Sequence, residues 1–276
     1  MTAVSRYFHC LVLLIVADCA IARPACAQDG RGAAPWLESE IETDRDSFTP
    51  ATTVVDPGRT IVESSYTFAD NRHTVETHSL PELVARVGVL PWLELRLGWN
   101  WEVGGAGGAF SDVEFGDEDL GTGAESDVEF GLKAQTTRQA DWIPESAVLI
   151  EGFTPTYGPA NDTDLTLGYV FGWTLPNGWK WDSAMRMGTG SEHDDRFSTW
   201  APSSVVKIPI GERWNIHFEY FGLCTEDKAE DSSRHFVSSG FHLLLTENLE
   251  IGTRFGFGIN GQSSRFFNNV GLGWRF

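Results

Sequence analysis

The chain has 276 residues and a formal net charge of -19 at pH 7, with 39 Asp and Glu against 20 Lys and Arg. This acidic balance argues against a nucleic-acid partner, because phosphate binding needs a basic face. Hydrophobic residues make up only 41% of the chain, whereas Gly (29) and Trp (11) are abundant. A soluble protein with so many aromatic residues needs a thick core. A membrane barrel instead turns its aromatic residues outward to lipid and lines its lumen with small and polar groups.

The amino terminus has the pattern of a removed export signal. Arg6 precedes an apolar stretch from Leu11 to Ala22 that is interrupted by Asp18, and residues 25–27, Ala-Cys-Ala, supply a small-x-small cleavage site. The apolar stretch is too short to span a membrane. The sequence therefore predicts a signal peptide over residues 1–27.

Cys26 leaves a lipoprotein alternative open. Arg23 and Pro24 disfavour it, because they stand where a lipid-attachment signal has an aliphatic and a small residue. Removal of the signal peptide takes away three of the four cysteines and leaves Cys224 alone. We therefore predict no intrachain disulfide in the mature chain.

Residues 28–58 follow as a polar stretch broken by Pro35, Pro50 and Pro57, without a clear hydrophobic period. Such a stretch is typical of a loop or arm and not of a strand. We predict a periplasmic amino-terminal arm or plug over residues 28–58, and an outer-membrane barrel over residues 59–276.

Two parts of the mature chain carry a recognisable pattern. The first is Ile-Glu-Thr-Asp-Arg-Asp-Ser-Phe-Thr at residues 41–49, followed by Val54, Val55, Pro57-Gly58 and a first strand that contains Glu63. The second is residues 83–97, where a strand leads through Pro91-Trp92 into Leu93-Glu94-Leu95-Arg96. Both parts resemble the outer-membrane proteins grouped as the MetA-pathway of phenol degradation family. The resemblance extends over essentially the whole mature chain and implies an outer-membrane channel or transporter, with a link to the uptake of aromatic compounds. Asp46 departs from the family pattern, which often has Pro after Asp-Arg.

Independently of this resemblance, a two-residue alternation of apolar and polar side chains predicts twelve strands. We place them at residues 60–70, 73–90, 92–103, 125–137, 145–156, 163–175, 179–189, 197–209, 212–225, 234–246, 249–260 and 264–276. Each is long enough to cross an apolar band of roughly 25 Å when tilted. The predicted fold class is an all-β, transmembrane, antiparallel up-and-down β-barrel of about twelve strands. Pro81 is the weakest point, because it either breaks the second strand or sits at a bulge.

The connections between these strands alternate in length, as expected for short periplasmic turns and longer outer loops. The short connections are residues 91–92, 176–178, 210–212 and 247–248, and the long ones are residues 104–124, 155–162, 189–196 and 226–233. Residues 137–144 are long for a periplasmic turn, and the first and last outer loops are short.

The final strand shows how the faces are assigned. Its apolar residues are Val270, Leu272, Trp274 and Phe276, and they alternate with glycines and Arg275 up to an aromatic carboxyl terminus. We predict that these four residues face lipid and form the membrane-insertion signal read by the barrel-assembly machinery. An interfacial girdle is predicted from four tryptophans near the predicted periplasmic ends of the strands, namely Trp92, Trp142, Trp179 and Trp214.

The charged residues of the strands alternate with the apolar ones and must face inward, because a charge on the lipid face is costly. The predicted lumen-lining residues are Glu63, Glu82, Arg86, Glu94, Arg96, Glu129, Lys133, Lys180, Asp182, Arg186, Glu219, Glu250, Arg254 and Arg275. Two interpretations remain open and are compatible. These residues form a structural network that fills a narrow lumen, or a constriction whose charges select solutes.

Acidic clusters lie in the predicted outer loops, and their spacing fits no EF-hand. They comprise Asp112, Glu114, Asp117, Glu118, Asp119, Glu192, Asp194, Asp195, Glu226, Asp227, Glu230 and Asp231. A solvated acidic rim is favoured over a dedicated calcium site, and divalent cations could bridge this rim to lipopolysaccharide. The hexapeptide Ser-Asp-Val-Glu-Phe-Gly occurs at residues 111–116 and again at 126–131. It offers the fourth strand two registers or extends a hairpin above the membrane.

An outer-membrane hydrolase is an alternative, since some barrels carry a Ser-His pair on the lipid face. His217 and His242 fall on the polar face and His235 lies at a strand edge, while neither Gly-x-Ser-x-Gly nor His-Glu-x-x-His occurs. The sequence therefore predicts no catalytic residue, no metal site and no cofactor. A soluble β-sandwich or lipocalin-like protein is disfavoured, because it would expose the outward aromatic residues as one large patch.

Together these patterns predict a barrel in the outer membrane of a Gram-negative-type bacterium. The predicted function is the passive passage of small solutes, hydrophobic or aromatic ones among them. A structural or adhesive barrel with a blocked lumen is the main alternative, ahead of the lipid hydrolase. The predicted partners are outer-membrane lipid, lipopolysaccharide, the barrel-assembly machinery and a small-molecule solute.

Overall fold

The computed structural model describes residues 41–72, 74–105, 123–158, 162–192, 195–226 and 231–276. The predicted signal peptide, the first part of the predicted arm, the first copy of the hexapeptide and most of the acidic loop residues lie outside this description. Over the described part of the chain, no helix has the length and hydropathy needed to cross a membrane.

The described residues form twelve strands, and all twelve predicted strands are confirmed. Their bounds are β1 Thr60–Asp70, β2 Thr77–Leu90, β3 Leu93–Gly104, β4 Gly123–Thr137, β5 Glu145–Tyr157, β6 Asp164–Thr174, β7 Lys180–Glu192, β8 Asp195–Ile210, β9 Trp214–Glu226, β10 Ser233–Thr246, β11 Leu249–Gly258 and β12 Phe266–Arg275.

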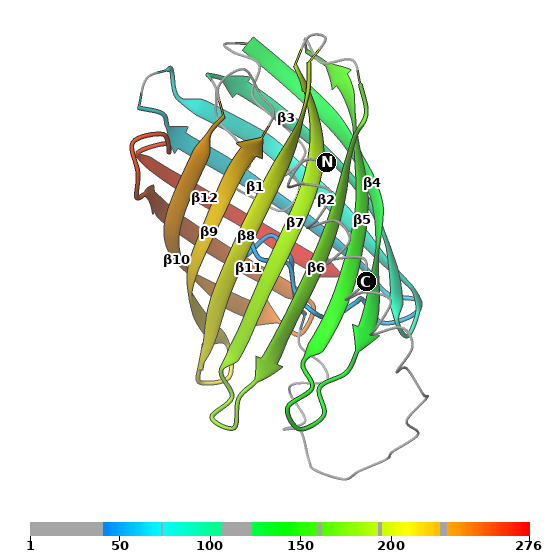
Figure 1. Ribbon diagram of the computed structural model, residues 1–276. Coiled ribbons are helices and arrows are strands. Elements are labelled where there is room, and N and C mark those ends of the chain that lie inside the picture. The colour runs from blue at the N-terminus through cyan, green and yellow to red at the C-terminus, as the bar shows by residue number, and fades with distance from the viewer. Residues whose placement is uncertain (1–40, 73, 106–122, 159–161, 193–194, 227–230) are drawn as a thin grey trace.

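The strands close into a single antiparallel barrel (Figure 1). Each strand pairs with its neighbours in sequence, and β1 pairs with β12 from Ile61 opposite Arg275 to Asp70 opposite Phe266. This last ladder removes both free edges, so every strand has two partners. The predicted up-and-down barrel is thereby confirmed.

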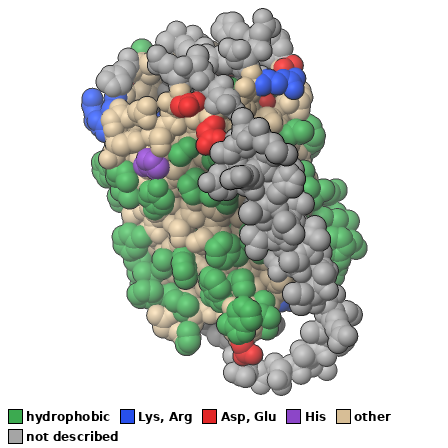
Figure 2. All heavy atoms as spheres, in the orientation of Figure 1, with side chains coloured by type: hydrophobic (Ala, Val, Ile, Leu, Met, Phe, Trp, Pro, Cys, Tyr) green, Lys and Arg blue, Asp and Glu red, His purple; other side chains and the backbone are tan. Residues whose placement is uncertain are grey.

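Alternation along each strand decides which residues face outward. In β3 the side chains of Leu95 and Leu97 are exposed, the latter by 60%, whereas Glu94 and Arg96, which alternate with them, are buried. Successive side chains of a strand point to opposite faces, so one set covers the outside and the other fills the inside. Figure 2 shows hydrophobic side chains spread over the outer face, with charged side chains near its ends.

Pro81 lies within a continuous β2 and does not break it. The ladder between β2 and β3 shifts its register between Ser79 and Glu82, and the ladder between β1 and β2 shifts between Ser65 and Thr67. Proline has no N–H to donate, so the ladder skips this point. Of the two readings of Pro81, the bulge is therefore the observed one.

The prediction of a long outer loop at residues 189–196 is wrong. Strand β7 continues to Glu192 and β8 begins at Asp195, with Thr189 paired to Ser198. The backbone ladder needs no apolar side chains, so these two strands remain paired as far as Glu192 opposite Asp195.

The inner wall also contains large aromatic residues, which the expectation of small and polar lumen groups did not include. Five phenylalanines share the inward parity of the charged residues and are buried, namely Phe153, Phe197, Phe221, Phe236 and Phe267. Three of them, Phe221, Phe236 and Phe267, belong to an apolar cluster that includes Phe48, which precedes the barrel in sequence. The inner wall thus combines an ionic part and an aromatic part.

Candidate functional site

Residues 41–55, which we name the inner segment, run inside the barrel (Figure 1). The side chains of residues 43–49 are buried, although most of them are polar or charged. Their partners belong to strands on opposite sides of the wall: Asp44 contacts Arg96 of β3, whereas Asp46 contacts Lys207 of β8. A segment that reaches both sides of a closed barrel must cross its interior.

The inner segment is folded back on itself. Thr53 Oγ1 donates to Glu42 Oε2 at 2.5 Å, and the backbone N–H of Ala51 donates to Asp44 Oδ1 at 2.9 Å. Both bonds join residues on either side of Phe48, and Ser47 Oγ donates to the carbonyl of Thr49 across it at 2.7 Å. The segment is therefore a loop whose tip is Phe48.

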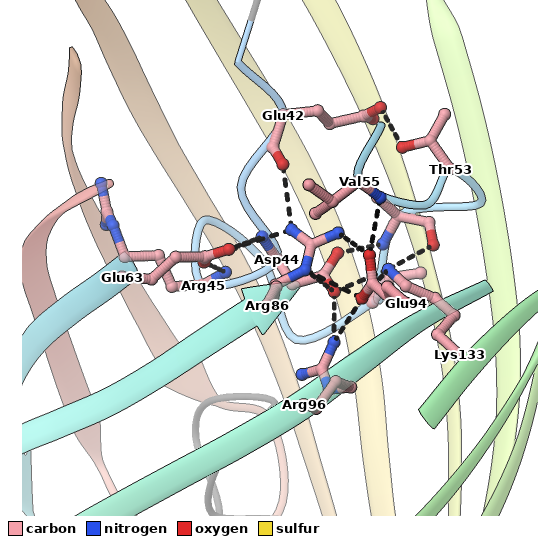
Figure 3. Close-up of polar contacts among 12 residues, drawn as sticks. Glu42, Asp44, Arg45, Thr53, Val55, Glu63, Arg86, Glu94, Arg96 and Lys133 are labelled. Atoms are coloured by element: carbon pink, nitrogen blue, oxygen red, sulfur yellow. Dashed lines mark hydrogen bonds and ion pairs between the residues drawn. The ribbon is translucent and has the colours of Figure 1, made fainter. Parts of the chain in front are cut away.

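Asp44 is the centre of the ionic part of the site (Figure 3). Its Oδ2 lies 2.6 Å from Arg96 Nη1, 2.7 Å from Lys133 Nζ and 3.4 Å from Arg86 Nε. Burial alone would raise the pKa of Asp44, but the charges of Arg86, Lys133 and Arg96 outweigh it and hold this pKa well below its ordinary value. Asp44 is therefore ionised and holds three wall cations of β2, β3 and β4.

The wall cations are also paired with wall carboxylates. Arg86 donates both Nε and Nη2 to Glu94 at 3.0 Å and donates Nη1 to Glu63 at 2.9 Å (Figure 3). Glu63 Oε2 accepts the backbone N–H groups of Asp44 and Arg45 at 3.0 and 2.9 Å. Such bidentate, charge-assisted bonds fix orientation, so the wall is ordered to receive the inner segment.

Two further carboxylates of the inner segment meet lysines. Glu42 Oε1 lies 2.6 Å from Lys180 Nζ of β7, and Asp46 Oδ2 lies 3.3 Å from Lys207 Nζ. Burial acts to raise the pKa of Glu42, but Lys180 and Lys207 lower it to about 2. The pKa of Asp46 is also lowered, because the charge of Lys207 outweighs the effect of burial. All three carboxylates of the segment are thus ionised against basic groups of the wall.

A histidine pair lies beside Asp46. His217 Nδ1 and His242 Nε2 are 3.0 Å apart, and His242 also lies 3.6 Å from Asp46 Oδ2 and 3.5 Å from Glu250 Oε1. Both histidines are buried and hydrogen-bonded, as predicted for histidines on the polar face. In the described part of the chain no group of three or more His, Cys, Asp or Glu has a metal-binding arrangement.

Most of the predicted lumen-lining residues are buried on the inward side of their strands. The buried ones are Glu63, Glu82, Arg86, Glu94, Arg96, Glu129, Lys133, Asp182, Arg186, Glu219, Glu250 and Arg254. Lys180 and Arg275 are partly exposed. Glu82 bonds Ser65 and Asn269, and Arg275 bonds Asn248 at a turn, so these two residues lie apart from the inner segment.

Several residues of the site were not predicted from the sequence. Lys207 and Glu151 lie in predicted strands with inward parity, so the alternation pattern could have found them. Glu151 Oε1 is 2.9 Å from Arg96 Nε. Asp44, Asp46 and Phe48 gave no such signal, because the stretch before the barrel has no period.

On the outer face, three residues of β9 and β10 form a serine, histidine and tyrosine chain. Ser233 Oγ lies 2.8 Å from His235 Nε2, and His235 Nδ1 lies 2.9 Å from the hydroxyl of Tyr220. A nucleophile, a base and an orienting group in this order are typical of hydrolases. A similar pair on β1 and β2 joins the hydroxyl of Tyr66 to His78 Nδ1 at 2.8 Å. Residues 76 and 80, which lie two positions before and after His78, are Glu and Leu, so this pair has no serine.

The closed ladder, the apolar outer face and the charged interior define a transmembrane β-barrel of the outer-membrane type. The family model described as "Putative MetA-pathway of phenol degradation" matches residues 43–276. The chain therefore belongs to this family, and the predicted resemblance is confirmed. Its location is the outer membrane of a Gram-negative-type bacterium.

Solved structures share this fold. The COG4313 outer membrane channel from Pseudomonas putida F1 superposes with a TM-score of 0.60 at 12% sequence identity, over 85% of this chain and 100% of that chain. The NanC porin superposes with a TM-score of 0.51 at 10% identity, over 78% of this chain and 98% of that chain. At these identities the likeness concerns the fold alone. No curated protein sequence matches the chain.

Proposed function

We propose that this protein is a channel for the passive passage of small solutes, hydrophobic or aromatic ones among them, and that the inner segment is its plug. The observation that carries the proposal is the ionic docking of the segment: Glu42, Asp44 and Asp46 each meet a basic side chain of the wall. The channel and porin named among the similar structures support the same reading.

Ionic docking separates this proposal from a barrel whose lumen is blocked permanently. Buried ion pairs add little net stability, because the cost of removing both charges from water offsets their attraction. A segment held through carboxylates and cations keeps its full hydrogen-bonding capacity in water, so it is suited to leave and return.

The test compares the mature chain with a variant that lacks residues 43–55, each refolded and inserted into liposomes. We expect the variant to admit small solutes at least tenfold faster in a swelling assay. Both proteins must be folded, as judged by heat-modifiable mobility on gels. If neither then admits solutes in the swelling assay, the structural or adhesive barrel is supported instead.

The outer-face geometry of Ser233, His235 and Tyr220 favours one second candidate, an outer-membrane ester hydrolase. We rank it below transport, because Tyr66 and His78 repeat the histidine and tyrosine contact without the serine. Packing at the membrane interface therefore explains such a pair without catalysis. Labelling of the wild-type chain by a fluorophosphonate, lost in Ser233→Ala but kept in Ser239→Ala, would establish the hydrolase.

We further propose that the barrel-assembly machinery reads the last strand. Val270, Leu272, Trp274 and Phe276 are exposed on the outer face, which leaves their side chains available for recognition before insertion. Lipopolysaccharide is the proposed partner of the acidic outer loops. Phe276→Ser is expected to lower the amount of heat-modifiable barrel in cells severalfold, whereas Phe241→Ser, on the same face of β10, is not.

A further inference from the structure

The inner wall forms a slot around the tip of the inner segment. The ring of Phe48 is fully buried and stacks on Phe221, with ring centroids 4.4 Å apart and planes inclined by 18°. The guanidinium carbon of Arg186 lies over the same ring, 4.2 Å from its centroid. The slot therefore offers a planar apolar group both an aromatic face and a cation.

Arg186 recognises more than the ring. Its Nη2 donates a hydrogen bond to the carbonyl oxygen of Phe48 at 2.9 Å. One guanidinium thus contacts an aromatic ring and an oxygen acceptor close to that ring. The guanidinium group is planar and carries several donors, so it suits both contacts at once.

The slot has a wider aromatic lining. Phe236 stacks on Phe221 with centroids 4.9 Å apart, and Phe267 meets Phe221 edge to face. Arg254 lies 5.2 Å from the ring centroid of Phe267. Aromatic rings and guanidinium groups therefore recur along this part of the wall.

The rest of the inner segment repeats one chemistry, a carboxylate against a wall cation, at Glu42, Asp44 and Asp46. The groups of the inner segment that the wall binds are therefore carboxylates and one aromatic ring. Once the segment leaves, Arg86 and Lys133 keep the wall carboxylate Glu94. Lys207 loses Asp46, and its charge then favours an anion in the lumen.

We propose that the slot is the solute site of the barrel, that it takes an aromatic carboxylate, and that Phe48 occupies it as an internal competitor. This inference rests on the proposed channel function. The solute ring takes the place of the Phe48 ring on Phe221, and its carboxylate accepts from Arg186 where the Phe48 carbonyl now accepts. A charge-assisted bond is stronger than the bond to the carbonyl that it replaces.

Glu219 does not oppose such an anion. Its carboxylate now accepts the backbone N–H groups of Phe48 and Thr49, but it also accepts from Arg254 and Ser238, each at 3.1 Å. When the tip leaves, these two wall groups keep the charge of Glu219 paired.

Solute and tip exclude each other, and this has a measurable consequence. The apparent affinity of the solute is reduced by the fraction of molecules in which Phe48 occupies the slot. Because the solute binds only the undocked state, its binding shifts the population towards release of the segment.

The test is isothermal titration calorimetry of phenylacetate into the refolded mature chain in detergent. We expect Phe48→Ala to bind phenylacetate at least tenfold more tightly than wild type, and the double variant Phe48→Ala with Arg186→Gln to lose this gain. Cyclohexylacetate, which lacks the aromatic ring, and phenylacetamide, which lacks the charge, should each bind Phe48→Ala at least fivefold more weakly. Phe218→Ala, on the outer face of β9, should bind phenylacetate like wild type.

The inference is overturned if folded Phe48→Ala binds no more tightly than wild type, or if the double variant keeps the gain. Should Phe48→Ala fail to fold, Phe48→Leu replaces it, with a gain of at least threefold expected and no gain counting against the site. Swelling by the variant that lacks residues 43–55 is scored separately. Swelling without the gain in affinity refutes the slot alone, and the gain without swelling refutes transport alone.

Discussion

At the scale of single residues, Asp44 is the carboxylate of the inner segment that meets three wall cations at once. Three cations of three neighbouring strands converge on its Oδ2 within 3.4 Å. Removal of one carboxylate from a buried ionic cluster leaves an excess of desolvated positive charge. The carboxylate of Asp44 thus fixes the position of the inner segment relative to β2, β3 and β4.

We predict that Asp44→Asn lowers the free energy of unfolding by about 3–5 kcal/mol, because it removes the carboxylate that lies nearest to the buried charges of Arg96 and Lys133. Urea unfolding from lipid vesicles measures this loss. Asp70→Asn is the matched control: its partner Arg265 lies at 3.2 Å but is 61% exposed, and such a surface pair contributes about 0–1 kcal/mol. Equal losses in the two variants would contradict the central role of Asp44.

At the scale of elements, the inner segment and the strands are held by different forces. Each strand is held by two backbone ladders, whereas the inner segment has no ladder and is held by side-chain bonds to the wall. Backbone ladders do not titrate between pH 2 and 7, but carboxylates do. Acid should therefore release the segment before it affects the barrel.

The pH window follows from the lowered pKa values of Glu42, Asp44 and Asp46. A carboxylate whose pKa is lowered on docking contributes stability that is fully present above its undocked pKa and is lost as pH falls through the docked value. For Glu42 these limits are 4.5 and about 2. We expect docking to weaken progressively as pH falls through this range.

The amide resonances of Phe48 and Thr49, which donate to Glu219 in the docked state, report this release by NMR. Lys180→Gln should move the loss to higher pH, because the charge that lowers the pKa of Glu42 is removed. Arg265→Gln, at an exposed pair, should leave the midpoint unchanged. Docking that persists unchanged at pH 2 would contradict the ionic account.

At the scale of the whole molecule, the barrel is a cylinder with an apolar outside and an ionic and aromatic inside. Its outside is suited to lipid because every backbone group is paired within the closed sheet. The cost of an outward charge should therefore depend on its depth in the bilayer.

Leu97, near the middle of β3, and Trp92, at the turn before it, are both exposed on the outer face, by 60% and 50%. We predict that Leu97→Arg costs about 2–4 kcal/mol of folding free energy in lipid vesicles and Trp92→Arg about 0–1 kcal/mol, because the cost falls towards the interface. Equal costs at the two positions would argue against this placement in the membrane.

The sequence by itself determined the strands, their number and the face of nearly every side chain. The reason is local: side chains alternate along a strand, so a two-residue period encodes both the element and its burial. Pairs such as Glu94 and Leu95 are read correctly without knowledge of any neighbouring strand. The same parity would have placed Lys207 and Glu151 inward.

Only the tertiary structure decided what fills the barrel. Asp44 lies 52 residues from Arg96, and Phe48 lies 171 residues from Glu219. Neither pairing has a local period, because each depends on the closure of β1 against β12 around a segment that is not a strand. The inward phenylalanines were missed for the same reason, since an aromatic side chain fits lipid or an aromatic slot equally well until the slot is seen.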